Sequence, residues 1–73
     1  MAKKSSESIY KIVEVIGTSP NSWEEAAKNA VVAASKTLRD LRIAEVVKQD
    51  MAIEKGKVVA YRTRMLLSFK YQA

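Results

Sequence analysis

The side chains available for chemistry in this chain are limited, because its 73 residues include neither histidine nor cysteine. That composition excludes disulfides, thiolate zinc sites, imidazole metal ligands and any Ser-His or Cys-His catalytic pair. What remains is oxygen chemistry, from 8 acidic residues whose carboxylates suit an oxygen-ligated ion. These acids are scattered, no Asp-x-Asp-x-Asp-Gly loop collects them, and no two have a spacing typical of acid–base catalysis. We therefore expect a binding or structural protein and not an enzyme.

The small size of the chain predicts that it works as an oligomer. A domain of roughly 60 residues buries only about 60% of the surface that its unfolded chain exposes, and is marginal when isolated. Small folds usually compensate with a disulfide, a metal or a partner subunit. The hydrophobic fraction of 48% is that of a folded protein. Oligomerisation, with an oxygen-ligated ion as a supplement, is the expected source of additional stability.

The net charge of +5 is spread along the chain over 13 Lys and Arg residues. A nucleic-acid-binding protein would gather such charge in one patch with interleaved aromatics, and only the segment 61–64 shows a local concentration. No apolar run approaches the roughly 18–20 residues of a membrane span, and the N-terminus lacks the apolar core of a signal peptide. We predict a flexible tail over 1–8, a single domain over 9–73, no nucleic-acid or membrane partner and a cytoplasmic location.

Four elements can be predicted along the domain. Residues 9–16 are rich in β-branched side chains and apolar on both faces, which indicates a covered strand ending at Gly17. A helix is expected from Ser22 to about Leu38, where Ser22 and Glu25 form a capping-box pattern and Ser19 before Pro20 is the rival N-cap. Strands over 43–53 and 58–71 follow, joined by a turn over 54–57.

The order β-α-β-β defines an α+β fold with a three-stranded antiparallel sheet. A right-handed crossover makes the first two strands parallel, and the third strand returns as a hairpin from the second. The third strand then lies in the middle, in the order 1-3-2. One helix covers one face of the sheet, and apolar residues on the opposite face require another cover. A second copy of the chain is the simplest one, which again predicts a homo-oligomer.

The segment Tyr10 to Pro20 reads Tyr-Lys-Ile-Val-Glu-Val-Ile-Gly-Thr-Ser-Pro and leads into an alanine-rich helix. This junction closely resembles the start of the dodecins, small proteins that assemble into hollow dodecamers, many of which bind flavins. The resemblance extends from about Tyr10 to Phe69 and includes the strand start 44–47 and the ending Ser68-Phe69. It implies that the chain forms a hollow homododecamer.

The resemblance also indicates the positions of a flavin site. Flavin-binding dodecins carry a Trp that stacks on the isoalloxazine ring and a Gln that hydrogen-bonds the flavin edge; these positions fall on Ile43 and Arg62, while Glu45 matches the acidic residue of the family. Ile43 has no π face, and the Arg62 guanidinium only donates hydrogen bonds. Trp23 lies at the helix start and is expected to anchor the first turn on the sheet or on a neighbouring subunit. Flavin binding is therefore expected to be weak or lost.

The segment Arg42 to Ala52 looks more like a branch of the dodecins that lacks this Trp, in which calcium binding has been proposed. The resemblance implies calcium or another divalent cation here, with oxygen ligands from Glu14, Glu45 and Asp50, assisted by Glu54, backbone carbonyls and water. Calcium takes six to eight oxygens, so equivalent carboxylates of several subunits would have to converge. The alternative is that these acids form ordinary ion pairs with the abundant Lys and Arg.

Three functions remain open at this point. The first is a dodecin-like homododecamer that binds or stores an ion or small ligand other than flavin. The second is a dodecin that stores riboflavin or FMN and tolerates Ile43 and Arg62. The third is a purely structural oligomer. The colour of the purified protein separates the first two, since bound flavin is yellow, and elemental analysis separates an ion-binding protein from a bare scaffold.

Overall fold

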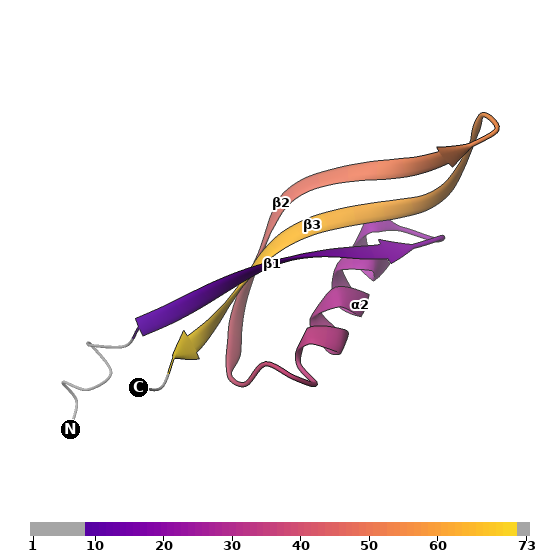
Figure 1. Ribbon diagram of the computed structural model, residues 1–73. Coiled ribbons are helices and arrows are strands. Elements are labelled where there is room, and N and C mark those ends of the chain that lie inside the picture. Colours follow the sequence, from indigo (N-terminus) through magenta and orange to yellow (C-terminus); the bar gives the residue numbers. More distant parts are fainter. Residues whose placement is uncertain (1–8, 72–73) are drawn as a thin grey trace, which may run out of the picture.

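The computed structural model describes residues 9–71, which form three strands and one helix (Figure 1). In chain order these are β1 (Ile9–Ser19), α2 (Trp23–Ala34), β2 (Leu41–Glu54) and β3 (Lys57–Tyr71). The predicted order β-α-β-β is therefore confirmed. The tail predicted for 1–8 and the last two residues of the predicted domain lie outside the described part of the chain.

The sheet has the predicted strand order, with β3 in the middle and antiparallel to both neighbours. β1 pairs with β3 along its whole length, from Ile9 opposite Tyr71 to Ser19 opposite Tyr61. The ladder between β2 and β3 is interrupted three times by register shifts, at Leu41/Ile43, Val46/Lys48 and Ala52/Ile53. Such irregularities bend a strand.

The predicted strands 43–53 and 58–71 were short by one or two residues at their ends, and two other predicted boundaries were wrong. β1 does not stop at Gly17, because Gly17, Thr18 and Ser19 continue the ladder opposite Thr63, Arg62 and Tyr61. The helix ends at Ala34 and not near Leu38, because Lys36 and Thr37 donate to carbonyls only three residues earlier, which tightens the chain out of the α-helix. Lys36 and Arg39 consequently lie beyond the helix, and its last turn contains no basic residue.

The start of the helix is set by local polar contacts. Ser22 is the N-cap, and its side chain accepts a hydrogen bond from the Glu25 backbone amide at 3.0 Å, as the capping pattern predicted. Ser19, the rival cap, instead accepts from the Asn21 backbone amide at 2.9 Å and donates to a Glu25 carboxylate oxygen at 3.1 Å. Both serines therefore fix the junction between β1 and α2 that was predicted from the sequence.

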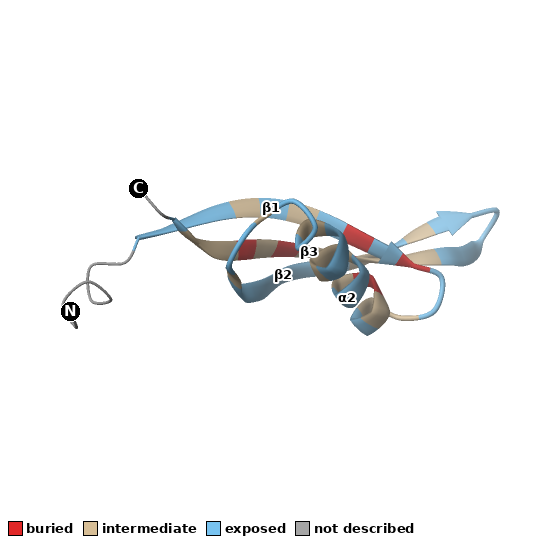
Figure 2. Ribbon diagram, turned by 90° about the horizontal axis from the view of Figure 1, so that it is seen from below, coloured by how far each residue is buried: buried red, intermediate tan, exposed pale blue. Residues whose placement is uncertain are grey.

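The helix packs closely on one face of the sheet, mainly against β1 and β3. The fully buried residues lie along this contact (Figure 2): Gly17 and Ser19 on β1, Ala26 on α2, and Thr63, Met65 and Leu67 on β3. Gly17 lies directly beneath the helix, where an added Cβ would overlap the Ala26 carbonyl group and the Ala30 side chain. Glycine on the strand and alanine on the helix together permit this close approach.

The face of the sheet away from the helix is uncovered. Alternate β3 residues are buried beneath α2, so the residues between them, with their ladder partners, belong to the opposite face. We call this the open face. Its apolar members Ile12, Ile16 and Ile43 are each 45% exposed or more. In the described residues, no helix is long and apolar enough to cross a membrane.

Candidate functional site

The five residues singled out from the sequence all belong to the open face. On the central strand, Arg62 alternates with the buried Thr63 and so points away from the helix. Asp50 is the β2 partner of Arg62, and Ile43 is the β2 partner of Ser68. Glu14 on β1 and Glu45 on β2 lie opposite Leu66, one on each side of it. The structure therefore brings the five residues to one surface, which the sequence did not predict, and shows how the charges on that surface pair.

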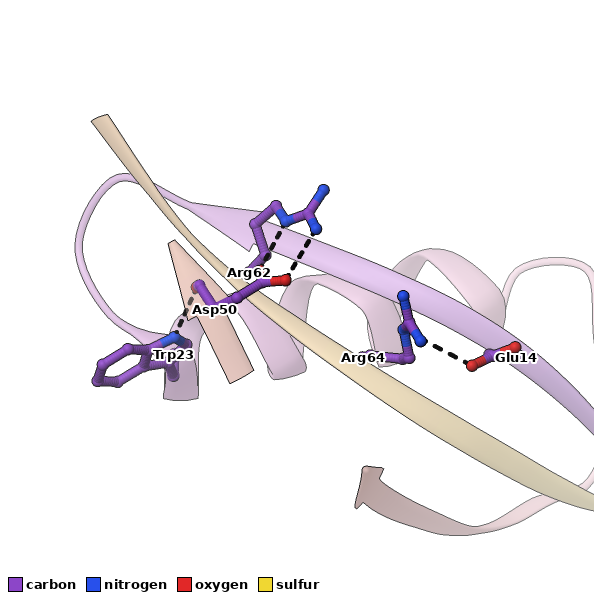
Figure 3. Close-up of polar contacts among 5 residues, drawn as sticks. All are labelled: Glu14, Trp23, Asp50, Arg62 and Arg64. Carbon is purple, nitrogen blue, oxygen red and sulfur yellow. Dashed lines mark hydrogen bonds and ion pairs between the residues drawn. The ribbon is translucent and has the colours of Figure 1, made fainter. Parts of the chain in front are cut away.

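Asp50 and Arg62 form the strongest ion pair on the open face (Figure 3). Nε and one terminal nitrogen of Arg62 donate to the two carboxylate oxygens of Asp50, at 2.7 and 2.9 Å. Two parallel charge-assisted bonds fix the orientation of both side chains. The hydrogen bond from Arg62 lowers the pKa of Asp50, with Arg64 and Lys48 adding electrostatic attraction. Asp50 is therefore already occupied by a cation from its own chain.

Glu14 is paired more weakly. Its carboxylate lies 3.7 Å from Nε of Arg64, and the two side chains are 55% and 42% exposed (Figure 3). Exposed ion pairs at such a distance contribute little, because water and salt screen them. Glu14 is thus available to exchange Arg64 for another cation.

Glu45 differs from both of the other acids. It is exposed, and it takes part in none of the ion pairs or side-chain hydrogen bonds found among residues 9–71. Its partner across the ladder is the apolar Leu66, which separates it from Glu14. Of the three predicted metal ligands, Glu45 is the one whose carboxylate has no cation beside it in the described part of the chain.

A complete calcium site does not exist within one copy of the described chain. No group of three or more acidic side chains gathers among residues 9–71. The oxygen chemistry of Glu45 and Glu14 suits calcium, but calcium needs six to eight oxygen ligands. The available donors are therefore oxygen atoms, the type that calcium prefers. Enough of them would come together only where several copies of the chain meet.

The flavin positions do not fit flavin in this chain. Ile43 is 61% exposed on the open face and offers no aromatic surface for a ring to stack on. Arg62 directs its Nε and one terminal nitrogen to Asp50, so that these donors are not available to a flavin edge. Both features agree with the weak flavin binding expected from the sequence.

Trp23 has the anchoring role that the sequence indicated. Its indole Nε1 donates to the backbone carbonyl of Asp50 at 3.0 Å (Figure 3), and its ring meets Tyr61 edge-on with centroids 5.0 Å apart. The backbone carbonyl of Trp23 accepts a hydrogen bond from the buried hydroxyl of Thr63 at 2.9 Å. One residue of the first helical turn thus fixes the helix to β2 and β3. No local pattern in the chain indicated the partner Asp50, because 27 residues separate the two.

These features define a class: a small α+β protein whose single helix covers one face of a 1-3-2 sheet and whose charged open face is left without a cover. The family model for the dodecins, described as "Dodecin", matches residues 9–72. This chain belongs to the dodecin family.

Individual relatives agree with this assignment. The chain is 46% identical over 63 residues to a curated protein named calcium dodecin from Mycobacterium tuberculosis, covering 86% of this chain and 89% of that protein. A crystal structure of that calcium dodecin, described as having a novel calcium-binding site, matches with a TM-score of 0.79 over 88% of this chain and 91% of that one. The dodecin from Streptomyces coelicolor matches with a TM-score of 0.88 at 38% identity, over 93% of this chain and 97% of that one.

Proposed function

We propose that this protein is a homododecameric binding and storage protein for a divalent cation, calcium first, and that flavin is not its main ligand. Support comes from membership of the dodecin family and from the 46% identity to a protein named calcium dodecin. The proposal describes a binding protein without catalytic activity, acting in the cytoplasm. Neither the lack of catalytic activity nor the cytoplasmic location depends on which ion is bound.

The observation that carries the cation proposal is the state of Glu45. This carboxylate is exposed on the open face and has no cation beside it among the described residues, whereas Asp50 is held by Arg62. A symmetry axis that brings several copies of Glu45 together would create strong mutual repulsion. A divalent cation relieves that repulsion and gains oxygen ligands from each copy. Glu14 is the expected second contributor, and Asp50 acts as a partner of Arg62 and not as a ligand.

Support for an oligomer comes from the distribution of apolar side chains. Only Ala26, Met65 and Leu67 form the fully buried apolar core of the described chain, while 13 large hydrophobic side chains are exposed. Apolar side chains exposed in this number favour burial against a protein partner. A chain of this length gains the missing burial from further copies of itself. The twelvefold number rests on the family alone.

The test combines a mass measurement with calcium-dependent melting. Light scattering of the unmodified protein should give about twelve times 8.1 kDa. After EDTA treatment and dialysis, calcium should raise the melting temperature, because a ligand at 100 times its dissociation constant stabilises the form that binds it by about 2.7 kcal/mol. Magnesium at equal concentration should raise it less, since magnesium retains its water and demands stricter geometry.

Glu45→Gln should remove the calcium shift while the oligomeric mass is unchanged. The matched control is Glu24→Gln, an equally conservative change at an exposed acid of the first helical turn, which should leave the shift intact. A monomeric mass with native circular dichroism would contradict the assembly. Absence of a calcium shift, with substoichiometric metal by elemental analysis, would instead favour a plain scaffold.

A further inference from the structure

Two arginines of the central strand lie on the open face, two residues apart, and differ in how firmly they are held (Figure 3). Arg62 makes two hydrogen bonds to Asp50, at 2.7 and 2.9 Å. Nε of Arg64 approaches the Glu14 carboxylate only to 3.7 Å, which is longer than a charge-assisted hydrogen bond. The Arg64 guanidinium donates none of the side-chain hydrogen bonds found among residues 9–71. Arg64 is therefore the more loosely held of the two cations.

The position of Arg64 in the sheet explains why it turns towards β1. Its partner on β2 is Lys48, and like charges directly opposite each other in a sheet repel. Its partner on β1 is Ile16, while Glu14 is the diagonal neighbour, opposite Leu66. Diagonal neighbours lie within reach of long side chains. Repulsion from Lys48 and attraction to Glu14 thus act in the same direction.

The two acids proposed as cation ligands lie in the ladder row next to Arg64. Glu14 on β1 and Glu45 on β2 are both opposite Leu66. Within residues 9–71, Glu14 has a cation of its own chain beside it and Glu45 does not. A divalent cation that reaches these carboxylates therefore competes with Arg64 for Glu14, whereas Glu45 is free of such competition in the described part of the chain.

We propose that Arg64 is the internal counter-ion of the cation site: it neutralises Glu14 in the cation-free protein and leaves Glu14 when a divalent cation binds. This inference rests on the proposed function and names the residue that regulates its site. Asp50 and Arg62 do not exchange in this way, because both carboxylate oxygens of Asp50 already accept hydrogen bonds. The released Arg64 remains attracted to Asp50, whose pKa its charge lowers.

Two consequences distinguish an internal counter-ion from an ordinary surface ion pair. The affinity for calcium is lower than the carboxylates alone would give, because binding separates Glu14 from Arg64. The cation-free assembly also depends on Arg64, since copies of Glu14 that converge where subunits meet would otherwise repel one another. An ordinary exposed pair contributes little to stability and has no connection with calcium.

Calcium titration of three proteins tests the competition. The unmodified protein, Arg64→Gln and the control Lys48→Gln are treated with EDTA, dialysed into about 10 mM salt and titrated calorimetrically with calcium chloride. Arg64→Gln should lower the Kd for calcium about twofold to fivefold, the ratio that the free energy of an exposed ion pair corresponds to. Lys48→Gln removes an equal charge opposite Arg64 but leaves Glu14 paired, so it should lower the Kd less.

Melting of the cation-free protein provides a second measurement that needs no calcium. In EDTA and about 10 mM salt, Arg64→Gln should melt below the unmodified protein, because Glu14 loses its counter-ion. Adding Glu14→Gln should recover most of the loss, since neighbouring groups that act together are not additive. Arg64→Lys retains the charge and should stay close to the unmodified protein. Salt at about 0.5 M should reduce the loss by screening.

The possible outcomes separate the counter-ion from the proposed function. If Arg64→Gln binds calcium no more tightly than Lys48→Gln, the exchange is overturned, while calcium binding by the unmodified protein leaves the proposed function standing. A loss of melting temperature that Glu14→Gln does not recover would also overturn the exchange, because Arg64 would then act through another residue. Absence of calcium binding in both the unmodified protein and Arg64→Gln would contradict the proposed function and the exchange together.

Discussion

Asp50 binds Arg62 through both carboxylate oxygens while its backbone carbonyl accepts the indole Nε1 of Trp23. A single residue on β2 thereby joins the open face of the sheet to the first turn of the helix on the other face. This arrangement explains why an acid that resembles a metal ligand in the sequence acts as a structural partner. The side-chain and backbone contacts of Asp50 can be tested separately. Asp50→Asn alters the carboxylate that binds Arg62, whereas Trp23→Phe removes the donor to the Asp50 carbonyl.

The Asp50 carboxylate should make stability dependent on acid pH. Arg62 lowers its pKa in the folded protein, so the folded state binds the proton less readily than the unfolded chain does. Its contribution is therefore complete above the unfolded carboxylate pKa of about 3.9 and is lost as pH falls through the lower folded value. Asp50→Asn should melt below the unmodified protein at pH 7, and the difference should close below about pH 4.

The control for this pH dependence is Glu14→Gln, which alters the longer and more exposed pair with Arg64. Its effect on the melting temperature at pH 7 should be smaller than that of Asp50→Asn, because exposed pairs contribute little. Melting is followed by circular dichroism at one protein concentration, since oligomer stability depends on concentration. A difference for Asp50→Asn that persists unchanged to pH 2.5 would contradict the role assigned to its carboxylate.

The indole hydrogen bond of Trp23 should stabilise the protein by about 1 kcal/mol, the usual net value for such a bond. Trp23→Phe keeps an aromatic ring beside Tyr61 but removes the Nε1 donor to Asp50, so it should lower the free energy of unfolding by roughly that amount or somewhat more. Urea unfolding provides the measurement. Thr63→Val is the companion variant, because it removes the hydroxyl that donates to the Trp23 carbonyl. Wild-type stability in both variants would show that the anchor is not needed.

Gly17→Ala should destabilise the protein by about 1–3 kcal/mol, the usual cost of forcing a methyl group into a packed contact. The added Cβ has no room, since it meets the backbone of Ala26 and the side chain of Ala30. Gly56→Asn is the matched control in the hairpin turn. Gly56 has a φ of 79° but nothing within 4 Å of an added Cβ, and asparagine tolerates that backbone region. Equal stability of the two variants in urea unfolding would contradict the close packing of β1 against α2.

The sequence predicted the fold well where local signals agree. Alternating side chains defined the strands, and Ser22 with Glu25 defined the start of the helix, because each depends on neighbours in the chain. The helix end was harder to predict, since Leu38 continues the apolar pattern although the amides of Lys36 and Thr37 already donate to carbonyls three residues earlier. The apolar periodicity of a sequence shows which side chains are apolar. It does not show which carbonyl accepts the hydrogen bond of a given backbone amide.

The residues of the open face could be named from the sequence, but neither their common surface nor their pairing could be predicted. Strand alternation alone would place Glu45 and Asp50, five residues apart, on opposite faces of β2. The register shift between Val46 and Lys48 brings both to the open face. Whether each acid has a cation beside it depends on register, because Asp50 faces Arg62 only in the ladder that the structure contains. Register is set by the hairpin and by the irregularities of β2, which the sequence does not reveal. Only the structure could therefore show that Glu45 has no cation beside it among the described residues.

Flavin affinity should be weak in the unmodified protein and should rise when the two missing groups are supplied. Ile43→Trp restores an aromatic face on the open side of β2, and Arg62→Gln restores an amide that both donates and accepts hydrogen bonds. Stacking alone contributes about 0.5–1.5 kcal/mol beyond the buried area, so the double variant should bind riboflavin or FMN roughly tenfold more tightly. Quenching of flavin fluorescence on titration provides the measurement.

The control for the flavin variant is Ile16→Trp combined with Arg62→Gln. Ile16 is also an exposed apolar residue of the open face, but it lies on β1 opposite Arg64, so a tryptophan there should not reproduce the gain. The comparison also accounts for the loss of the Asp50–Arg62 pair, because both double variants lack it. If the unmodified protein binds flavin at nanomolar concentration, the interpretation of Ile43 and Arg62 is wrong. If both tryptophan variants gain equally, the effect is non-specific stacking and not the restored site.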